Sequence, residues 1–199
     1  EADPWTVITK EDSHEKIGFG NDSTFPAVSI VDPELMLSVP PHLTAYQGMD
    51  AFFHAAEGVI ASCASPISDL YALKSIELLA RHLPVAVRDG ANVEARAQVA
   101  FANTLSGFVE SSSSCTSEHS IEHALSANHP QLAHGAGLTM ISQAYFGFFV
   151  GKIPDALFVS MARAMGEDVD ALPVAEQPRA FLCALAKLIA AVGLADLKM

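Results

Sequence analysis

Cysteine and basic side chains are both scarce in this chain of 199 residues, and each shortage excludes a class of protein. The three cysteines, Cys63, Cys115 and Cys183, are odd in number and widely spaced, which excludes a disulfide framework and predicts a reducing, cytoplasmic location. There are 11 Lys and Arg against 23 Asp and Glu, with a formal net charge of −12. Because no basic cluster is present to neutralise phosphates, we expect neither nucleic acid nor an anionic membrane surface as a partner.

Long hydrophobic runs are also missing. The most apolar stretch, residues 135–151, is interrupted by Thr139, Ser142 and Gln143 and falls short of a membrane span. Half of the residues are nevertheless apolar, which is enough for one core of ordinary size. No signal peptide is visible at the start of the sequence.

Two short runs with strand character come first, at residues 5–9 and 27–31, and helical periodicity begins after Pro41. We expect Gly48 to separate a first turn from the helix that follows. Apolar spacing, proline starts and glycine stops predict helices over residues 50–63, 66–87, 93–111, 138–150, 154–165 and 176–192. The sequence therefore predicts a mainly α protein with a short β segment at its start.

Acidic and histidine side chains suggest a metal site. Asp50 and His54 stand four residues apart, so both leave the same face of a helix. His119 and His123 have the same spacing, and His134 lies among glycines that could let the backbone approach a ligand. A set of imidazoles with one carboxylate suits Fe²⁺ or Zn²⁺ better than Mg²⁺ or Ca²⁺. Other side chains stay open as ligands: Glu110, Glu118 and His129.

A competing pattern occupies the same stretch. His119-Ser120-Ile121-Glu122-His123 fits H-x-x-E-H, an inverted zinc-peptidase pattern in which the glutamate is the general base. This hypothesis needs a distant acidic ligand, for which Glu176 is the obvious candidate, and it leaves Asp50, His54 and His134 unused. A non-catalytic helical metal-binding protein is a further alternative. A helical phosphohydrolase is less favoured, because the chain contains no His-Asp dipeptide.

Several segments in order resemble the iron-containing (group III) alcohol dehydrogenase family. The segments are Ile30-Val31-Asp32-Pro33-Glu34-Leu35-Met36, Val39-Pro40-Pro41, Gly48-Met49-Asp50-Ala51 with His54-Ala55-Ala56-Glu57-Gly58, Glu118-His119-Ser120-Ile121-Glu122-His123-Ala124-Leu125, and Ala133-His134-Gly135. The resemblance extends over nearly the whole chain. The loop between His123 and His134 is about one residue longer than in lactaldehyde reductase-like members, which leaves its path open.

The resemblance implies a role for each matching position. Asp50, His54, His119 and His134 match the four metal ligands of the family, and His123 matches a histidine beside the nicotinamide that helps to relay the proton. Lys16 matches a lysine near the cofactor ribose. The implied activity is hydride transfer between a primary alcohol or aldehyde and NAD or NADP, with the metal as Lewis acid, in a homo-oligomer such as a dimer. Two further expectations concern Glu57, which could orient His54, and Trp5, which could line the substrate entrance.

The resemblance also predicts how the chain is organised. Family members are about twice as long, and their Gly-Gly-Gly-Ser loop for the cofactor pyrophosphate does not occur here. We therefore expect an internal fragment: residues 1–40 as the remnant of an α/β nucleotide-binding domain and residues 41–199 as a C-terminally incomplete, all-helical metal-binding domain of the dehydroquinate synthase-like fold. Such a fragment should be inactive alone and should expose apolar surface.

Overall fold

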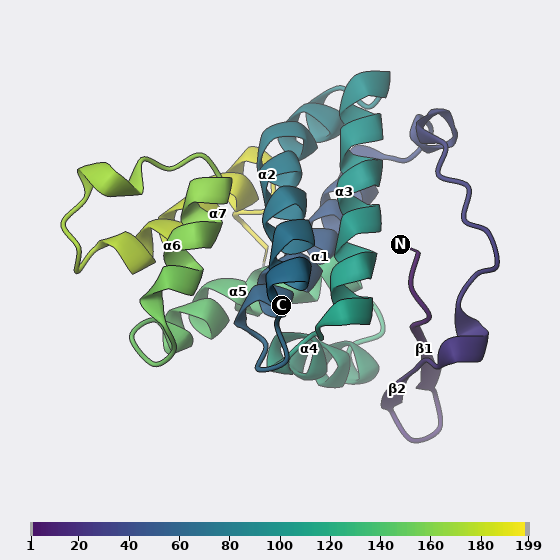
Figure 1. Cartoon of the computed structure of the whole chain (residues 1–199). Coiled ribbons are helices and arrows are strands. Elements are labelled where there is room, and N and C mark those ends of the chain that lie inside the picture. Colours follow the sequence, from purple (N-terminus) through teal and green to yellow (C-terminus); the bar gives the residue numbers. More distant parts are fainter. Residues whose placement is uncertain (1, 198–199) are drawn as a thin grey trace.

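Helices make up most of the computed structural model, which describes residues 2–197, so the prediction of a mainly α chain is confirmed. Two strands come first and seven α-helices follow (Figure 1). Their bounds are β1 Thr6–Lys10, β2 Glu15–Phe19, α1 Pro41–Ile60, α2 Pro66–Arg88, α3 Val93–Ser112, α4 Ser117–Asn128, α5 His134–Phe149, α6 Asp155–Ala164 and α7 Ala180–Ala191. Among the described helices, none is long and apolar enough to cross a membrane.

Helix α1 lies at the centre, packed against α2, α3 and α5. Its middle is buried on all sides because the sequence there is almost entirely apolar or small. Phe52 stacks on Phe181 of α7 and Phe53 on Phe146 of α5, with ring centroids 6.3 Å apart in both pairs. Polar groups on α1 are therefore carried by a tightly packed helix.

Gly48 does not break α1, and the expectation of a separate first turn is wrong. The helix runs through this residue from Pro41 to Ile60. A Cβ atom at Gly48 would stand 2.2 Å from Cδ1 of Leu83, so the glycine allows α2 to approach α1 closely. A packing requirement therefore explains this glycine, and its helix-breaking tendency is overridden by tertiary contacts.

The two described strands form an antiparallel hairpin, in which Thr6 pairs with Phe19 and Lys10 with Glu15. The first strand agrees with the prediction, but the second expected strand, residues 27–31, is wrong. Among residues 2–197 this segment has no strand partner, and Val28 and Ile30 are 78% and 87% exposed. A β-branched run forms a strand only where another strand completes its hydrogen bonds.

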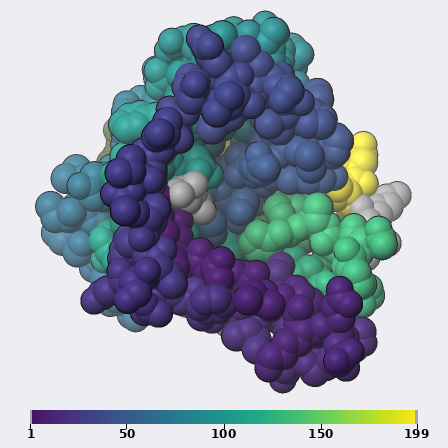
Figure 2. Space-filling view, turned by 90° about the vertical axis from the view of Figure 1, so that its right-hand side faces the viewer, coloured from purple at the N-terminus to yellow at the C-terminus, as the bar shows by residue number. Residues whose placement is uncertain are grey.

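The N-terminal segment up to η2 (Pro33–Met36), a short 3₁₀ turn, lies along one side of the helices (Figure 1). Seen from that side, it frames a hollow in front of the helices (Figure 2). β2 contacts α4, and η2 contacts α3. The segment therefore touches the helical part at both ends and leaves a space between. The predicted division into two domains at residue 40 stays a prediction.

Candidate metal centre

Three functional side chains come from one stretch of α1. Asp50, His54 and Glu57 follow each other at helical spacings and point from the same side of the helix. His54 is 7% exposed and Glu57 is fully buried. Buried charges of this kind require partners, and the partners come from α4 and α5, which are distant in sequence.

The Asp50 carboxylate lies at the centre of three imidazoles. Its Oδ1 atom is 3.3 Å from Nε2 of His119 on α4, 3.3 Å from Nε2 of His134 on α5 and 3.6 Å from Nε2 of His54. Four donors about 2.1 Å from one ion, arranged as a tetrahedron, are roughly 3.4 Å apart. The spacing and the donor chemistry of Asp50, His119 and His134, which form one donor group, therefore fit a divalent metal. His54 lies 3.6 Å from Asp50 but belongs to a separate donor group with His119 and Cys115, so the predicted set of four ligands stays a prediction.

Two buried glutamates accept hydrogen bonds from the imidazoles of His119 and His134 on the side away from Asp50. Nδ1 of His119 donates to Glu57 Oε2, and Nδ1 of His134 donates to Glu122 Oε2. Each bond fixes a ring so that its Nε2 atom faces Asp50. The expectation that Glu57 orients His54 is wrong, because the i,i+3 position carries Glu57 to the α4 side. There it also accepts from the backbone N–H groups of Thr116 and Glu118, at 2.9 and 3.0 Å.

The glycines after His134 allow this packing. His134 is the first residue of α5. A Cβ at Gly135 would stand 2.1 Å from the backbone oxygen of Tyr46, and one at Gly137 would stand 2.8 Å from Glu122 Oε1. We expected these glycines to bring backbone close to a ligand, but they bring α5 close to α1 and make room for the carboxylate that orients His134.

Burial and neighbouring charges shift the pKa values of the groups in this site in different directions. Burial opposes ionisation of Asp50, but the histidines around it hold its pKa well below the usual value. Burial also opposes protonation of His134, yet its bonds to Asp50 and Glu122 raise the pKa of this imidazole to about 9. In contrast, burial, with Lys16 and His134 nearby, lowers the pKa of His123 to about 4. His123 is therefore a neutral imidazole at neutral pH.

A cavity of about 570 Å³ opens onto these groups. His123 lies at its wall, with its ring centroid 5.3 Å from that of His134. Cys115 and Asp3 at this wall were not expected from the sequence, since neither belongs to a recognisable pattern. The lining residues come from the N-terminal segment, α1, α3, α4, α5 and the loop before α4: Asp3, Trp5, Thr6, Val7, Gly18, Asp50, His54, Glu110, Ser114, Cys115, Thr116, His119, Ser120, His123 and His134.

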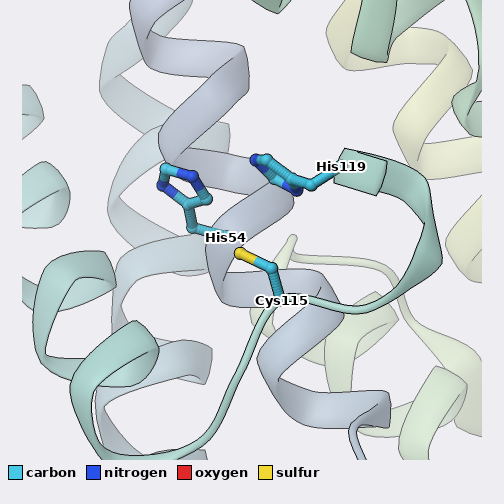
Figure 3. A group of neighbouring side chains, drawn as sticks. All are labelled: His54, Cys115 and His119. Atoms are coloured by element: carbon cyan, nitrogen blue, oxygen red, sulfur yellow. The ribbon is translucent and has the colours of Figure 1, made fainter. Parts of the chain in front are cut away.

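Cys115 forms an alternative donor group with His54 and His119 (Figure 3). Its thiol donates to Glu110 Oε1 over 3.2 Å. Burial and the carboxylates of Glu110 and Glu57 raise the pKa of this thiol far above its usual value. Since a thiol binds metal as the thiolate, this group is a poorer metal site than the one around Asp50.

The other candidate ligands are less well placed. Burial, with Glu57 and Asp50 nearby, raises the pKa of Glu118 well above the usual value, which disfavours the carboxylate form that binds a metal. His129 is exposed at the end of α4, and Glu176 is exposed before α7. Glu110 Oε1 is 3.7 Å from His54 Nε2. Within the described residues, Glu110 belongs to none of the donor groups that could share one ion.

The geometry also disfavours the peptidase hypothesis. His119 and His123 occur together in no donor group of the described chain. Glu122, the expected general base, is fully buried and bonded to His134. A base that must activate water needs access to it, so Glu122 is better described as the group that orients His134.

Lys16, predicted to contact the cofactor, lies on β2 and points at α4. Its Nζ atom donates to Ser126 Oγ at 2.9 Å and lies 3.4 Å from Glu122 Oε2. The lysine therefore touches the carboxylate that orients His134. Its predicted role at the cofactor ribose stays a prediction.

Comparison with known proteins identifies the family. The model of the Fe-containing alcohol dehydrogenase family, C-terminal part, matches residues 44–197. The chain belongs to this family. The matched region contains every residue placed around Asp50, so the resemblance read from the sequence and the expected fold class are both confirmed.

Individual relatives support this family membership. The chain is 32% identical to 1,3-propanediol dehydrogenase of Citrobacter freundii over 94% of its own length and 48% of the relative. It is 32% identical to NAD-dependent methanol dehydrogenase of Bacillus methanolicus, over 90% of the chain and 46% of that protein. The crystal structure of a 1,3-propanediol oxidoreductase superposes with a TM-score of 0.90 at 30% identity, covering 96% of the chain and 50% of that structure. The chain spans about half the length of the relatives it matches.

Proposed function

We propose that this chain is the metal-holding and substrate-facing part of an alcohol dehydrogenase or aldehyde reductase that uses NAD or NADP. The observation that carries the proposal is the convergence of three Nε2 atoms on Asp50 Oδ1, at 3.3 to 3.6 Å. Family membership and the names of the relatives, one of them NAD-dependent, support the same reaction class.

The residues around Asp50 take specific roles in this proposal. Asp50, His54, His119 and His134 would hold Fe²⁺ or Zn²⁺, with Glu57 and Glu122 orienting two of the imidazoles. The bound metal would supply Lewis-acid polarisation of the alcohol or aldehyde oxygen during hydride transfer to or from the nicotinamide. His123, neutral at physiological pH, would accept and pass on the hydroxyl proton at an imidazole nitrogen.

Metal titration tests the proposed ligands. Anaerobic addition of Fe²⁺ or Zn²⁺ to the purified chain, followed by native mass spectrometry, should give one metal per chain. Asp50→Ala and His134→Ala should lose it. The matched control is His129→Ala, which removes an exposed histidine outside the donor group. Retention of metal by His134→Ala would defeat the assignment of ligands.

A non-catalytic metal-binding protein is the second candidate, and only a reaction assay separates the two. The assay should use the metal-loaded protein with NADH or NADPH and a short aldehyde. His123→Ala should then keep its metal and lose most of its turnover. Equal turnover of His123→Ala and the unsubstituted protein would show that His123 takes no part in the reaction.

A further inference from the structure

A row of hydroxyl groups leads from helix α5 to the carboxylate that holds His119. Ser117 Oγ donates to the Tyr145 hydroxyl at 3.2 Å, and the Tyr145 hydroxyl lies 2.6 Å from Thr116 Oγ1. Thr116 Oγ1 in turn donates to Glu57 Oε1. Each hydroxyl has one proton to donate, and that of Thr116 goes to the carboxylate, so Tyr145 is the donor to Thr116. The row therefore runs in one direction and ends on Glu57.

Glu57 has two tasks, one for each carboxylate oxygen. Its Oε1 atom accepts from the backbone N–H groups of Thr116 and Glu118 at the start of α4. Thr116 is the N-cap residue of α4, but its own side chain makes no capping hydrogen bond, so the carboxylate from α1 supplies the cap. The Oε2 atom accepts from Nδ1 of His119. The orientation of one carboxylate therefore sets both the start of α4 and the direction of an imidazole that faces Asp50.

The Thr116 hydroxyl is the only side-chain donor among the three hydrogen bonds described at Glu57 Oε1. Glu57 is fully buried, where the loss of a donor to a charged acceptor is not replaced by water. With the hydroxyl removed, Oε1 would keep two backbone donors from the same turn. We expect the carboxylate to rotate more freely in that case, and Oε2 would then hold His119 less firmly.

Tyr145 holds the Thr116 hydroxyl in place from α5. The tyrosine is 8% exposed, and its ring packs edge-on against Phe149 with the centroids 5.2 Å apart. Burial raises the pKa of the phenol, so it keeps the proton that it donates. The same helix begins with His134. Tyr145 therefore ties the helix that carries His134 to the first turn of the helix that carries His119.

We propose that Thr116 and Tyr145 are positioning residues of the metal centre, which fix the carboxylate of Glu57 and, through it, the His119 Nε2 atom that faces Asp50. The inference rests on the proposed function, because it concerns the same metal site. Neither hydroxyl is a ligand in this role, and both act through Glu57.

Co²⁺ binding tests the proposal, because the visible absorption of this ion reports the geometry of its ligands as well as its occupancy. Thr116→Val removes the hydroxyl and keeps the volume of the side chain. We expect it to bind Co²⁺ about tenfold more weakly, the lower end of the loss seen when a group supporting a metal ligand is removed, with shifted absorption bands. Tyr145→Phe removes one neutral hydrogen bond and should weaken binding about threefold. Thr116→Ser retains a hydroxyl and should restore both the affinity and the spectrum.

Matched variants separate positioning from a loss of stability. Thr104→Val removes a hydroxyl of α3 that donates to the Ala100 carbonyl oxygen at 3.0 Å, and Tyr71→Phe removes a hydroxyl of α2. Neither should change the affinity for Co²⁺ or the spectrum. Urea denaturation of each metal-free chain gives its free energy of unfolding. A purely structural effect lowers this free energy and leaves the spectrum of the bound ion unchanged.

The outcomes distinguish this inference from the proposed function. Co²⁺ binding by Thr116→Val with unchanged affinity and spectrum overturns the inference alone. A loss in Thr116→Val that Thr116→Ser does not restore also overturns it, since the hydroxyl is then not the cause. Absence of Co²⁺ binding by the unsubstituted chain overturns both the inference and the proposed function.

Discussion

Each metal-facing histidine of α4 and α5 depends on a buried glutamate. Glu122→Ala removes the acceptor of the His134 Nδ1 proton and leaves Lys16 without its carboxylate. We expect metal affinity to fall by about 10- to 100-fold, since loss of such a supporting carboxylate has this size. Competition with a metal chelator measures the change. Asn128→Ala, at the exposed end of the same helix, is the control.

The three thiols should differ sharply in reactivity. Cys63 and Cys183 are exposed, whereas Cys115 is partly buried and its pKa is raised by burial and by Glu110. The thiolate is the reactive form, so at mildly alkaline pH Cys115 should be alkylated much more slowly than the other two, as peptide mass spectrometry will show. Cys115→Ser should keep its metal. Loss of the metal in this variant would favour the donor group that contains the thiol.

Spacing in the sequence indicated the candidate donor residues but not the side chains that hold them in place. Asp50 and His54, or His119 and His123, are related by one helical turn, which a sequence displays. Glu57 bonds to His119, 62 residues away, and Lys16 approaches Glu122 across 106 residues. Such pairs depend on how helices pack, and packing is not encoded in local periodicity. The position of Glu57 within an otherwise apolar stretch was the available signal.

At the level of elements, the hairpin is tied to α4 by Lys16. Lys16→Met should loosen this attachment, because Glu122 and Ser126 lose their cation. Faster hydrogen exchange at β1 and β2, together with weaker metal binding, is the expected result. Lys10→Met removes an exposed lysine of the same hairpin, whose side chain is 59% exposed, and should change neither. Unchanged exchange in Lys16→Met would show that the contact does not hold the hairpin.

Two glycines inside helices should respond in opposite ways to alanine. Gly48→Ala forces a Cβ to 2.2 Å from Leu83, and overpacking of this kind costs about 1–3 kcal/mol. Gly147→Ala on α5 meets only Leu182 Cδ1 at 3.8 Å, so the helix propensity of alanine should stabilise it by about 0.5–1 kcal/mol. Urea denaturation gives both values. A stable Gly48→Ala would mean that α1 and α2 are less tightly packed than described.

Helices were more predictable than the strand region for a physical reason. A helix satisfies its hydrogen bonds within one segment, so proline starts and apolar periodicity locate α2 and α3 almost to the residue. A strand needs a partner, and the run at residues 27–31 has none among the described residues. The prediction for Gly48 was wrong because the sequence does not distinguish a glycine that permits close packing from one that ends a helix.

At the level of the whole molecule, exposed apolar side chains concentrate in the N-terminal segment. Val28, Ile30 and Leu35 are 78%, 87% and 77% exposed, and several neighbours between Trp5 and Leu37 are also accessible. Contiguous apolar surface of this kind usually marks a region that another chain or domain covers. The predicted homo-oligomer would cover this surface and stays a prediction.

Self-association through this surface is the expected behaviour of the purified chain. Sedimentation velocity should show species larger than a monomer at micromolar concentration, and an apolar dye should bind. Substituting Val28 and Ile30 together by serine should reduce both signals without lowering the free energy of unfolding, because neither side chain is buried. Val174→Ser removes an equally exposed side chain, 82% accessible, from the distant segment before α7. If Val174→Ser reduces association as much as the double substitution of Val28 and Ile30 does, self-association depends on exposed apolar side chains in general and not on residues 28–30.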